Sequence, residues 1–361
     1  MKLRTLNCAL LTAALLAAAC GSDSDTAATD ADRCESNKAA GTITYVSGFE
    51  FAASSGIVDV ISAKEEGYFD EVCLTVELRP SYAAANAALL ASGQAQFGNV
   101  GTISDVLNAN LNADADMVIL AHYGNTAIEG IVVPADGDIN VLADIQGKLV
   151  GVKGDIPASL QNMLAAGGAP RGTFDELLLE SFDPIAGGFD LGIDALPVYT
   201  NNEPYQLDAA GFDYTLFRPL DFDIPSSFGY LVTSGSFLTE HPGVVEDFLR
   251  AAFKGYDFAM NNPDAAIAHS VSYLASSDAA YLTEVTEGPR WRTEVTLVAE
   301  TKPADLGFGM INSELLGAEV QLMTDNAIFD SLPDWESMTE ASVAAGLYDG
   351  TDLIWPGPAG K

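Results

Sequence analysis

Basic residues are scarce in this sequence: 16 Lys and Arg stand against 51 Asp and Glu, which gives a formal net charge of -35. A surface this negative repels nucleic acid and anionic lipid headgroups, so neither is expected as a partner. The acidic residues are spread along the chain. This distribution is typical of a charge that keeps a protein soluble, as in salty surroundings.

Histidine and cysteine are also rare. His122, His241 and His269 lie in no recognisable motif, and no Cys-x-x-Cys pair is present, so a zinc site is not expected. The Gly-x-Ser-x-Gly and Cys/His nucleophile patterns of many hydrolases are missing as well. We therefore expect a protein that is not an enzyme and that has no cofactor.

The first residues have the composition of an export signal. Lys2 and Arg4 form a basic start, and residues 6–19 form an apolar stretch too short and too rich in alanine for a stable membrane span. This stretch ends in LAAACG at residues 16–21. The ending resembles a bacterial lipobox, in which small residues precede a cysteine that is lipidated and becomes the mature N-terminus. We therefore expect lipidation at Cys20.

Residues 1–19 are accordingly predicted to be a lipoprotein signal peptide. An ordinary secretory signal cut near Ala19 is the alternative, and both interpretations export the protein. Residues 20–40 are rich in Ser, Asp, Thr and Ala and are predicted to be a flexible tether. The expected location is the outer face of the cell membrane, or the periplasm.

Two cysteines, Cys34 and Cys73, remain in the exported part. In an oxidising compartment such a pair suggests a disulfide between the end of the tether and the first strand region. The alternative is a buried thiol at Cys73 with a free one at Cys34.

From Thr42 onward the chain alternates strand-like and helix-like segments. The expected strands are 42–46, 74–78, 95–97, 117–121, 128–133, 149–152, 176–180, 195–199, 214–217 and 230–233. Helical spacing is found at 57–66, 82–91, 103–109 and 158–166, and from Pro242 onward. This order predicts an α/β protein with mixed, mostly parallel sheets flanked by helices.

The strand order suggests two lobes joined by two crossings of the chain. We expect lobe 1 to comprise residues 41–129 plus 230–361, and lobe 2 residues 130–229, with hinges near Gly130 and Gly229. Ligands of open α/β sheets bind at the carboxyl ends of strands, so the site is expected in the cleft between the lobes.

Four collinear motifs resemble those of type II periplasmic binding proteins, the solute-binding components of ABC importers. They are AKEEGYF at residues 63–69, GQAQFG at 93–98, LADIQGKLVGV at 142–152 and HPGVVEDFL at 241–249. The resemblance implies the two-lobed fold, a small-molecule ligand and closure of the lobes on that ligand. It also implies a monomer that works with an ABC permease and its ATPase.

Within that superfamily, YTNNEP at residues 199–204 resembles the branch that binds thiamine-pyrimidine precursors, whose relatives take riboflavin, sulfonates or nitrate. In that branch a Glu at this place faces the cleft, which implies a ligand role for Glu203. The segment KGDIP at residues 153–157 departs from the family's Gly-Ser. Asp155 in that segment would repel an anionic ligand.

The candidate ligand-binding residues are those expected at strand ends and helix starts that face the cleft. They are Phe49, Phe51, Ser54, Ser55, Asn99, Thr102, Tyr123, Asn125, Lys153, Tyr199, Asn202 and Glu203. Aromatic rings stack on flat heterocycles, hydroxyls at a helix start donate and accept hydrogen bonds, and a carboxylate accepts from an exocyclic amine.

Each of these residues also has an ordinary structural interpretation. The aromatic residues would pack under a helix, the serines would cap one, and the glycines beside Asn99 and Thr102 would form a tight turn. Lys153 would be solvated. Glu203 would open a helix together with Pro204.

We therefore expect a binding protein for a small aromatic nitrogen heterocycle of the thiamine-pyrimidine type. Riboflavin is the nearest alternative ligand, and a sulfonate or nitrate is another. Outside transport, the alternatives are an enzyme of pyrimidine synthesis that shares the fold, or a surface interaction protein that has lost its ligand.

Overall fold

The computed structural model describes residues 30–113, 115–180 and 183–357. The predicted signal peptide at 1–19 and Cys20 lie outside these residues. None of the helices in the described part of the chain combines the length and the apolar character that crossing a bilayer needs.

The larger sheet has five strands in the order β2-β1-β3-β10-β4. Their bounds are β1 Thr42–Phe51, β2 Thr75–Pro80, β3 Phe97–Val100, β4 Met117–Gly124 and β10 Phe228–Ser234. Strand β1 pairs in parallel with β2 and β3, whereas β10 pairs antiparallel with β3 and β4. Each strand lies at or next to a segment that the sequence pattern predicts.

Helices cover both faces of this sheet, because its strands are apolar on both sides. On β1, Tyr45 and Val46 point to opposite faces and enter two different core clusters. One face packs against α2 (Val58–Glu65), α9 (Pro242–Asn261) and α10 (Pro263–Leu274). The other face packs against α4 (Ala83–Ala91), α5 (Ile103–Ala113) and α12 (Ser313–Asp325).

A second set of strands forms lobe 2. Its strands are β5 Glu129–Pro134, β6 Leu149–Val152, β7 Asp175–Leu178, β8 Leu196–Tyr199 and β9 Tyr214–Phe217. Strand β5 lies between β8 and β9 and is antiparallel to both, while β6 and β7 are parallel and join β8 through a bridge between Val150 and Ala195. The sheets of the described residues are thus mixed, but the expectation that they are mostly parallel is wrong. The ladders of β5, of β10 and of the short strands at 348–349 and 352–353 are antiparallel, and they outnumber the parallel ones because both crossings of the chain enter a sheet in the opposite direction.

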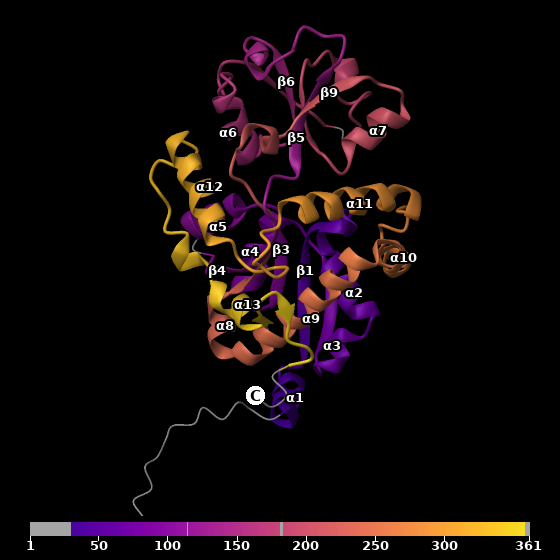
Figure 1. The fold of residues 1–361 in the computed structure, drawn as a ribbon, viewed down its shortest axis with the longest axis vertical. Coiled ribbons are helices and arrows are strands. Elements are labelled where there is room, and N and C mark those ends of the chain that lie inside the picture. The colour runs from indigo at the N-terminus through magenta and orange to yellow at the C-terminus, as the bar shows by residue number, and fades with distance from the viewer. Residues whose placement is uncertain (1–29, 114, 181–182, 358–361) are drawn as a thin grey trace, which may run out of the picture.

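The chain passes between the two sheets twice, through residues 125–128 and 218–227. Gly130 lies just inside β5, and Gly229 lies in β10 with a φ of 74° that favours glycine. The division expected from the sequence, lobe 1 for 41–129 plus 230–361 and lobe 2 for 130–229, cuts β5 after Glu129 and β10 after Gly229. Because each strand belongs to one sheet, we propose that Glu129 belongs to lobe 2 and that Phe228 and Gly229 belong to lobe 1. Figure 1 shows lobe 2 at the top, above the larger sheet.

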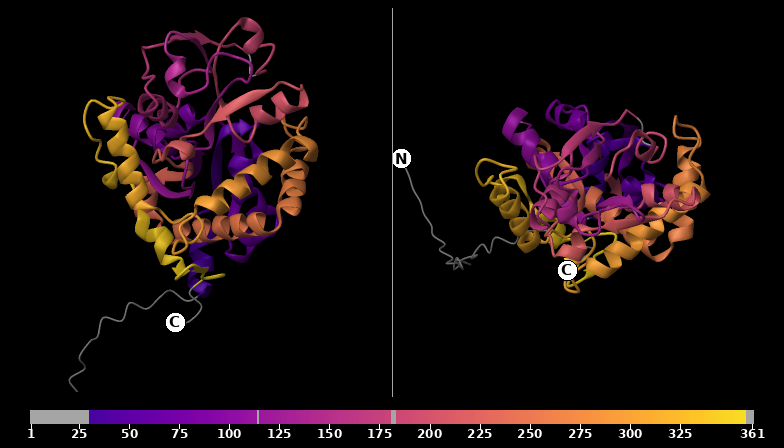
Figure 2. Two further views of the ribbon diagram at one scale, coloured as in Figure 1. Left: turned by 45° about the horizontal axis from the view of Figure 1, so that its top comes forward. Right: turned by 90° about the horizontal axis from the view of Figure 1, so that it is seen from above.

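The remaining elements are short, apart from α11 at Glu284–Thr301. They are α1 Asp30–Ala39, α3 Tyr68–Glu71, α6 Ala158–Ala166, α7 Glu203–Ala209, α8 Gly235–Glu240, α13 Ala341–Gly346, β11 Tyr348–Asp349 and β12 Asp352–Leu353. Helix α11 runs along the junction of the two lobes (Figures 1 and 2).

The prediction of a flexible tether over 20–40 is wrong for its last part, because residues 30–39 form α1. Arg33 pairs with Asp247 of α9, and the Asn37 amide donates to Asp247 Oδ2 at 2.7 Å. A disulfide with an S–S length of 2.10 Å joins Cys34 to Cys73. The disulfide is the one that the sequence suggests. The contacts of Arg33 and Asn37 come from α9, far along the chain, so local composition does not reveal them.

The core depends on Phe248 of α9, whose ring stacks on Phe97 of β3 with centroids 3.8 Å apart and on Phe69 at 5.3 Å. We expect Phe248→Ala to lower the free energy of unfolding by about 3–5 kcal/mol, because it removes a fully buried ring and leaves a cavity. Urea denaturation measures the change. Phe222→Ala is the matched control, since Phe222 is 36% exposed, and an equal loss in both variants would contradict the assignment.

Candidate ligand-binding site

A cavity of about 140 Å³ lies between the lobes. Lobe 1 lines it with the carboxyl ends of β1, β3 and β4, the start of β10, and residues of α2, α9 and α11. Lobe 2 contributes Glu129 of β5 together with Tyr199, Asn201 and Asn202. The cavity is therefore at the strand ends where the sequence predicts the site.

Aromatic side chains form most of the apolar wall. The Phe49 ring lies against Gly56 and Gly101, and a Cβ added at these glycines would stand 3.4 and 3.3 Å from ring atoms. Tyr123 stacks on Tyr256 with centroids 3.9 Å apart and an interplanar angle of 11°. Tyr199 lines the cavity and remains 44% exposed, so its ring is available to a flat ligand.

Three buried carboxyls also line the cavity: Asp59 of α2, Glu129 of β5 and Glu294 of α11. Burial raises the pKa of Asp59 to about 6, although a 2.7 Å hydrogen bond from Tyr123 Oη favours its charged form. Burial likewise raises the pKa of Glu129 to about 7 and that of Glu294 to about 8. Near neutral pH the site thus combines ionised carboxyls, which accept hydrogen bonds, with protonated carboxyls, which can also donate them.

Each of these carboxyls is held by a neighbour. Ser159 Oγ donates to Glu129 Oε2 at 3.2 Å. Glu294 hydrogen-bonds to the side chains of Ser55 in lobe 1 and Asn201 in lobe 2. The carboxyl positions are therefore defined before a ligand enters, which lowers the entropy lost on binding.

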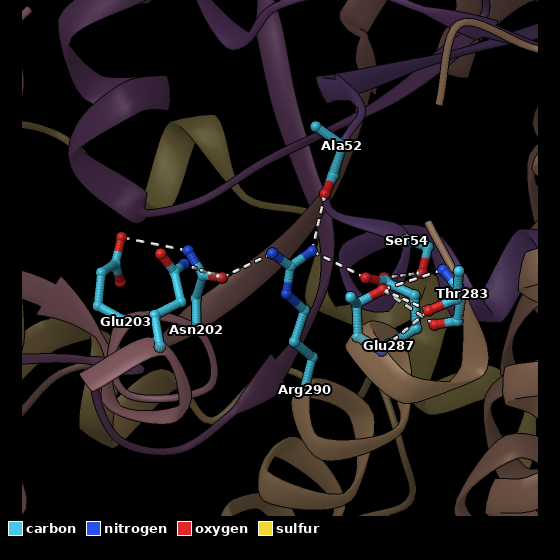
Figure 3. Close-up of polar contacts among 9 residues, drawn as sticks. Ala52, Ser54, Asn202, Glu203, Thr283, Glu287 and Arg290 are labelled. Carbon is cyan, nitrogen blue, oxygen red and sulfur yellow. Dashed lines mark hydrogen bonds and ion pairs between the residues drawn. The ribbon is translucent and has the colours of Figure 1, made fainter. Parts of the chain in front are cut away.

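Among the described residues that line the cavity, Arg290 of α11 is the basic one. Its Nη1 donates to Glu287 Oε1 at 2.8 Å and to Ala52 O at 3.1 Å, and its Nη2 donates to Asn202 Oδ1 at 2.6 Å (Figure 3). The charge of Arg290 is thus already matched by Glu287. The cavity as a whole favours hydrogen-bond donors and cations over anions.

Half of the candidates from the sequence line the cavity. These are Phe49, Ser55, Asn99, Tyr123, Tyr199 and Asn202. The Asn99 amide also joins β1 to the next turn, because Gly48 N donates to its Oδ1 at 2.6 Å and its Nδ2 donates to Gly56 O at 2.8 Å.

Four other candidates lie away from the cavity and have structural roles. Phe51 packs edge-on against Tyr273, and Ser54 donates to Glu287. Thr102 N donates to Asp105 Oδ2 at 2.9 Å at the start of α5. Asn125 Oδ1 accepts a 3.0 Å hydrogen bond from Asn312. These residues stand near strand ends or helix starts, as expected, but their contacts lie outside the cavity.

Glu203 and Lys153 do not line the cavity either. Glu203 is 2% exposed, and Lys153 Nζ donates to its Oε1 at 2.7 Å. Asn202 Nδ2 also donates to Oε1, at 3.1 Å, and Tyr199 N donates to Oε2 at 2.8 Å. Glu203 opens α7 with Pro204 after it, which is the structural alternative left open by the sequence. Through the hydrogen bond from Tyr199 N, Glu203 holds the backbone that carries the Tyr199 ring.

The sequence analysis missed Asp59, Glu129, Arg290 and Glu294. A signal existed for the first two, because Asp59 stands between Val58 and Val60 and Glu129 is the first residue of the buried apolar strand β5. Acidic residues in such runs are costly to bury and mark functional positions. Nothing in the local sequence distinguishes Arg290 or Glu294 from other residues of a charged helix.

The profile of the NMT1/THI5-like family matches residues 55–266. The chain belongs to this family. Its solved structural neighbours confirm the type II periplasmic-binding-protein fold. The aliphatic sulphonate-binding protein SsuA of Escherichia coli has a TM-score of 0.63 at 13% identity, covering 87% of this chain and 94% of that one. The nitrate-binding protein NrtA of Synechocystis has a TM-score of 0.57 at 13% identity, with coverage of 84% and 87%.

Two curated relatives are more similar in sequence. The formylaminopyrimidine-binding protein of Halalkalibacterium halodurans is 29% identical over 218 residues, 57% of this chain and 63% of the relative. The riboflavin-binding protein RibY of Chloroflexus aurantiacus is 25% identical over 219 residues, 57% of this chain and 58% of the relative. The chain thus spans less than two thirds of the length of either relative.

Buried carboxyls with raised pKa values make stability depend on pH. Burial also raises the pKa of Glu319, near the second crossing, to about 8. Because the folded state binds these protons more tightly than the unfolded chain, their stabilisation is present below the ordinary carboxyl pKa and is lost as pH rises toward the folded values. We expect the free energy of unfolding to fall by more than about 1 kcal/mol between about pH 5 and about pH 8.5.

Urea denaturation across this pH range measures the slope. Glu319→Gln is expected to make it shallower, because Gln does not titrate, whereas Glu77→Gln at an exposed position leaves it unchanged. A stability that stays constant or rises over this range in the native sequence would contradict the assignment.

Proposed function

We propose that this protein is the extracytoplasmic solute-binding component of an ABC importer, and that its ligand is a small amino-substituted nitrogen heterocycle of the thiamine-pyrimidine type. The observation that carries this proposal is a small interlobe cavity in which aromatic faces adjoin three buried carboxyls, Asp59, Glu129 and Glu294. The aromatic side chains would stack on the heterocycle, and the carboxyls would form hydrogen bonds with the polar atoms at its edge.

The chemistry of an aminopyrimidine edge matches these groups. An exocyclic amine donates to a carboxylate, and an unprotonated ring nitrogen accepts from a carboxyl that keeps its proton. Asp59, with a pKa of about 6, is mostly ionised at neutral pH, whereas Glu294, with a pKa of about 8, mostly keeps its proton. The site therefore offers a carboxylate acceptor and a carboxyl donor at the same pH.

Size and charge favour this ligand over the alternatives. A cavity of about 140 Å³ is small among protein ligand sites, which supports a single ring over the three rings of riboflavin. Sulfonate and nitrate would meet three carboxyls and one guanidinium that Glu287 already pairs. The formylaminopyrimidine-binding relative supports the same choice.

The importer role rests on the family and on the two-lobed fold. Ligand contacts to both lobes would favour the closed arrangement, which a permease and its ATPase then recognise. We further propose that the protein acts as a monomer and is held at the membrane by lipid on Cys20. The small residues before this cysteine support the anchor.

We expect formylaminopyrimidine to bind in isothermal titration calorimetry, and riboflavin, an alkanesulfonate and nitrate to bind more weakly or not at all. Tyr199→Ala should weaken formylaminopyrimidine binding about tenfold through lost stacking. Glu129→Gln should weaken it by a similar factor, because a carboxylate acceptor is lost. Tyr281→Ala is the matched control, since Tyr281 is 66% exposed and does not line the cavity.

The outcomes separate the alternatives. Tighter binding of riboflavin or of a sulfonate would overturn the proposed ligand class while keeping the importer role. If no member of the panel bound, the ligand-free interaction protein would become the better description. Product formation from a bound heterocycle would identify an enzyme.

For the anchor, we expect the protein made in a bacterial host to incorporate radiolabelled palmitate and to sediment with membranes. Cys20→Ser should abolish both, because the lipid-bearing thiol is gone. Cys8→Ser, inside the predicted signal peptide, is the control and should change neither. Label retained in Cys20→Ser would overturn the anchor.

A further inference from the structure

Helix α11 presents one face to both lobes. Arg290, Thr293 and Glu294 are spaced by three and four positions, so they lie on the same side of the helix. Arg290 bonds Ala52 O in lobe 1 and Asn202 Oδ1 in lobe 2. The two next residues of this face also bond lobe 2. Thr293 bonds the hydroxyl of Tyr205 in lobe 2, and Glu294 bonds Ser55 and Asn201, one from each lobe.

Lobe 1 holds the guanidinium in place from its own side. Glu287, one turn earlier on α11, is 2% exposed, accepts from Ser54 and pairs with Arg290 Nη1 at 2.8 Å (Figure 3). The Arg290 side chain is itself only 20% exposed. Its Nη2 therefore has a defined direction toward Asn202, and little side-chain entropy remains to be lost when the lobes meet.

The bonds to Asn201, Asn202 and Tyr205 exist only while lobe 2 lies at its present distance from lobe 1. Contacts made in one arrangement and lost in another are what bias a two-state equilibrium. Because Arg290 and Glu294 also line the cavity, the helix that bonds both lobes is also a wall of the cavity. Residues 284–301 lie outside the region that the family profile matches, 55–266.

We propose that α11 is a clasp on the cleft: Arg290 is a positioning residue that ties lobe 2 to lobe 1 through Asn202, and Glu294 contacts the bound solute. The Glu294 part rests on the proposed solute-binding function. The Arg290 part does not, because the interlobe bonds are present without any ligand. The C-terminal segment thereby sets both the open–closed equilibrium and part of the ligand specificity.

The first experiment measures lobe separation without ligand, by energy transfer between dyes on Leu111→Cys in lobe 1 and Leu191→Cys in lobe 2, both exposed positions. We expect Arg290→Met to shift the population toward wider separation. Arg290→Lys should be intermediate, because an ammonium keeps the charge beside Glu287 but cannot span the acceptors as a guanidinium does.

Arg292→Met is the matched control. Arg292 lies on the same helix, is 56% exposed at its side chain and pairs with Asp264 of lobe 1 at 2.6 Å. It should leave the separation unchanged. Asn202→Ala should reproduce the Arg290→Met shift. The double variant should separate the lobes little further than either single variant, since both changes remove the same contact between Arg290 and Asn202. An unchanged separation in Arg290→Met, or full additivity, would overturn the clasp.

The second experiment titrates formylaminopyrimidine. Arg290→Met should raise its dissociation rate constant about tenfold, a size typical of coupling between sites. Glu294→Gln should weaken its binding while leaving the unliganded lobe separation near that of the native protein, because Gln keeps hydrogen bonds to Ser55 and Asn201. Unchanged affinity in Glu294→Gln would overturn the ligand contact. If the native protein did not bind formylaminopyrimidine, the proposed ligand would be refuted. The lobe separations measured with the dyes would be unaffected, because that experiment uses no ligand.

Discussion

Insertion of β10 between β3 and β4 is the constraint on which the rest of the structure depends. The strand brings the chain back from lobe 2 and completes the larger sheet, with antiparallel ladders on both sides. Its start also reaches the site, since Phe228 and Gly229 line the cavity. Everything after β10, including α9 with its buried Phe248 and the clasp helix α11, is positioned by this return.

Close packing beside the crossing leaves little freedom at this junction. A Cβ on Gly124 would stand 2.0 Å from a Phe228 ring atom, so the end of β4 and the start of β10 fit only with glycine there. Behind them, Ser227 bonds Glu319 of α12. On the far side of the cleft from α11, Asn326 Nδ2 donates to Asn162 Oδ1 of lobe 2 at 2.8 Å. The C-terminal segment thus touches lobe 2 on two sides.

Electrostatics links stability to the site. A chain with a net charge of -35 buries carboxyls where a ligand would bind, and burial rather than repulsion from neighbouring carboxylates is the main cause of their raised pKa values. Such groups stabilise the fold less as pH rises. A donor-rich ligand would compensate this cost by satisfying the carboxyls, which couples occupancy of the cleft to stability.

Much of the fold was predictable because it rests on short-range patterns. Alternation along β2, the apolar stripe of α9 and the order of strands and helices all depend on residues that are neighbours in sequence. Phe49, Tyr123 and Tyr199 were identified for the same reason, since they lie at the carboxyl ends of β1, β4 and β8. The helix α1 was not predicted, although its disulfide was, because Asp247, which pairs with its polar side chains, lies far along the chain.

The sequence by itself indicated the succession of strands and helices along the chain and the family, and it supports the expectation of an export signal. Only the tertiary structure decided which carboxyls face the ligand. Glu203 is turned away by Lys153, 50 residues earlier, whereas Glu294 enters the cavity from a helix that no motif marks. The direction of a side chain depends on partners that folding brings together. Arg290, for example, donates to Ala52 O, and these two residues are 238 positions apart in the sequence.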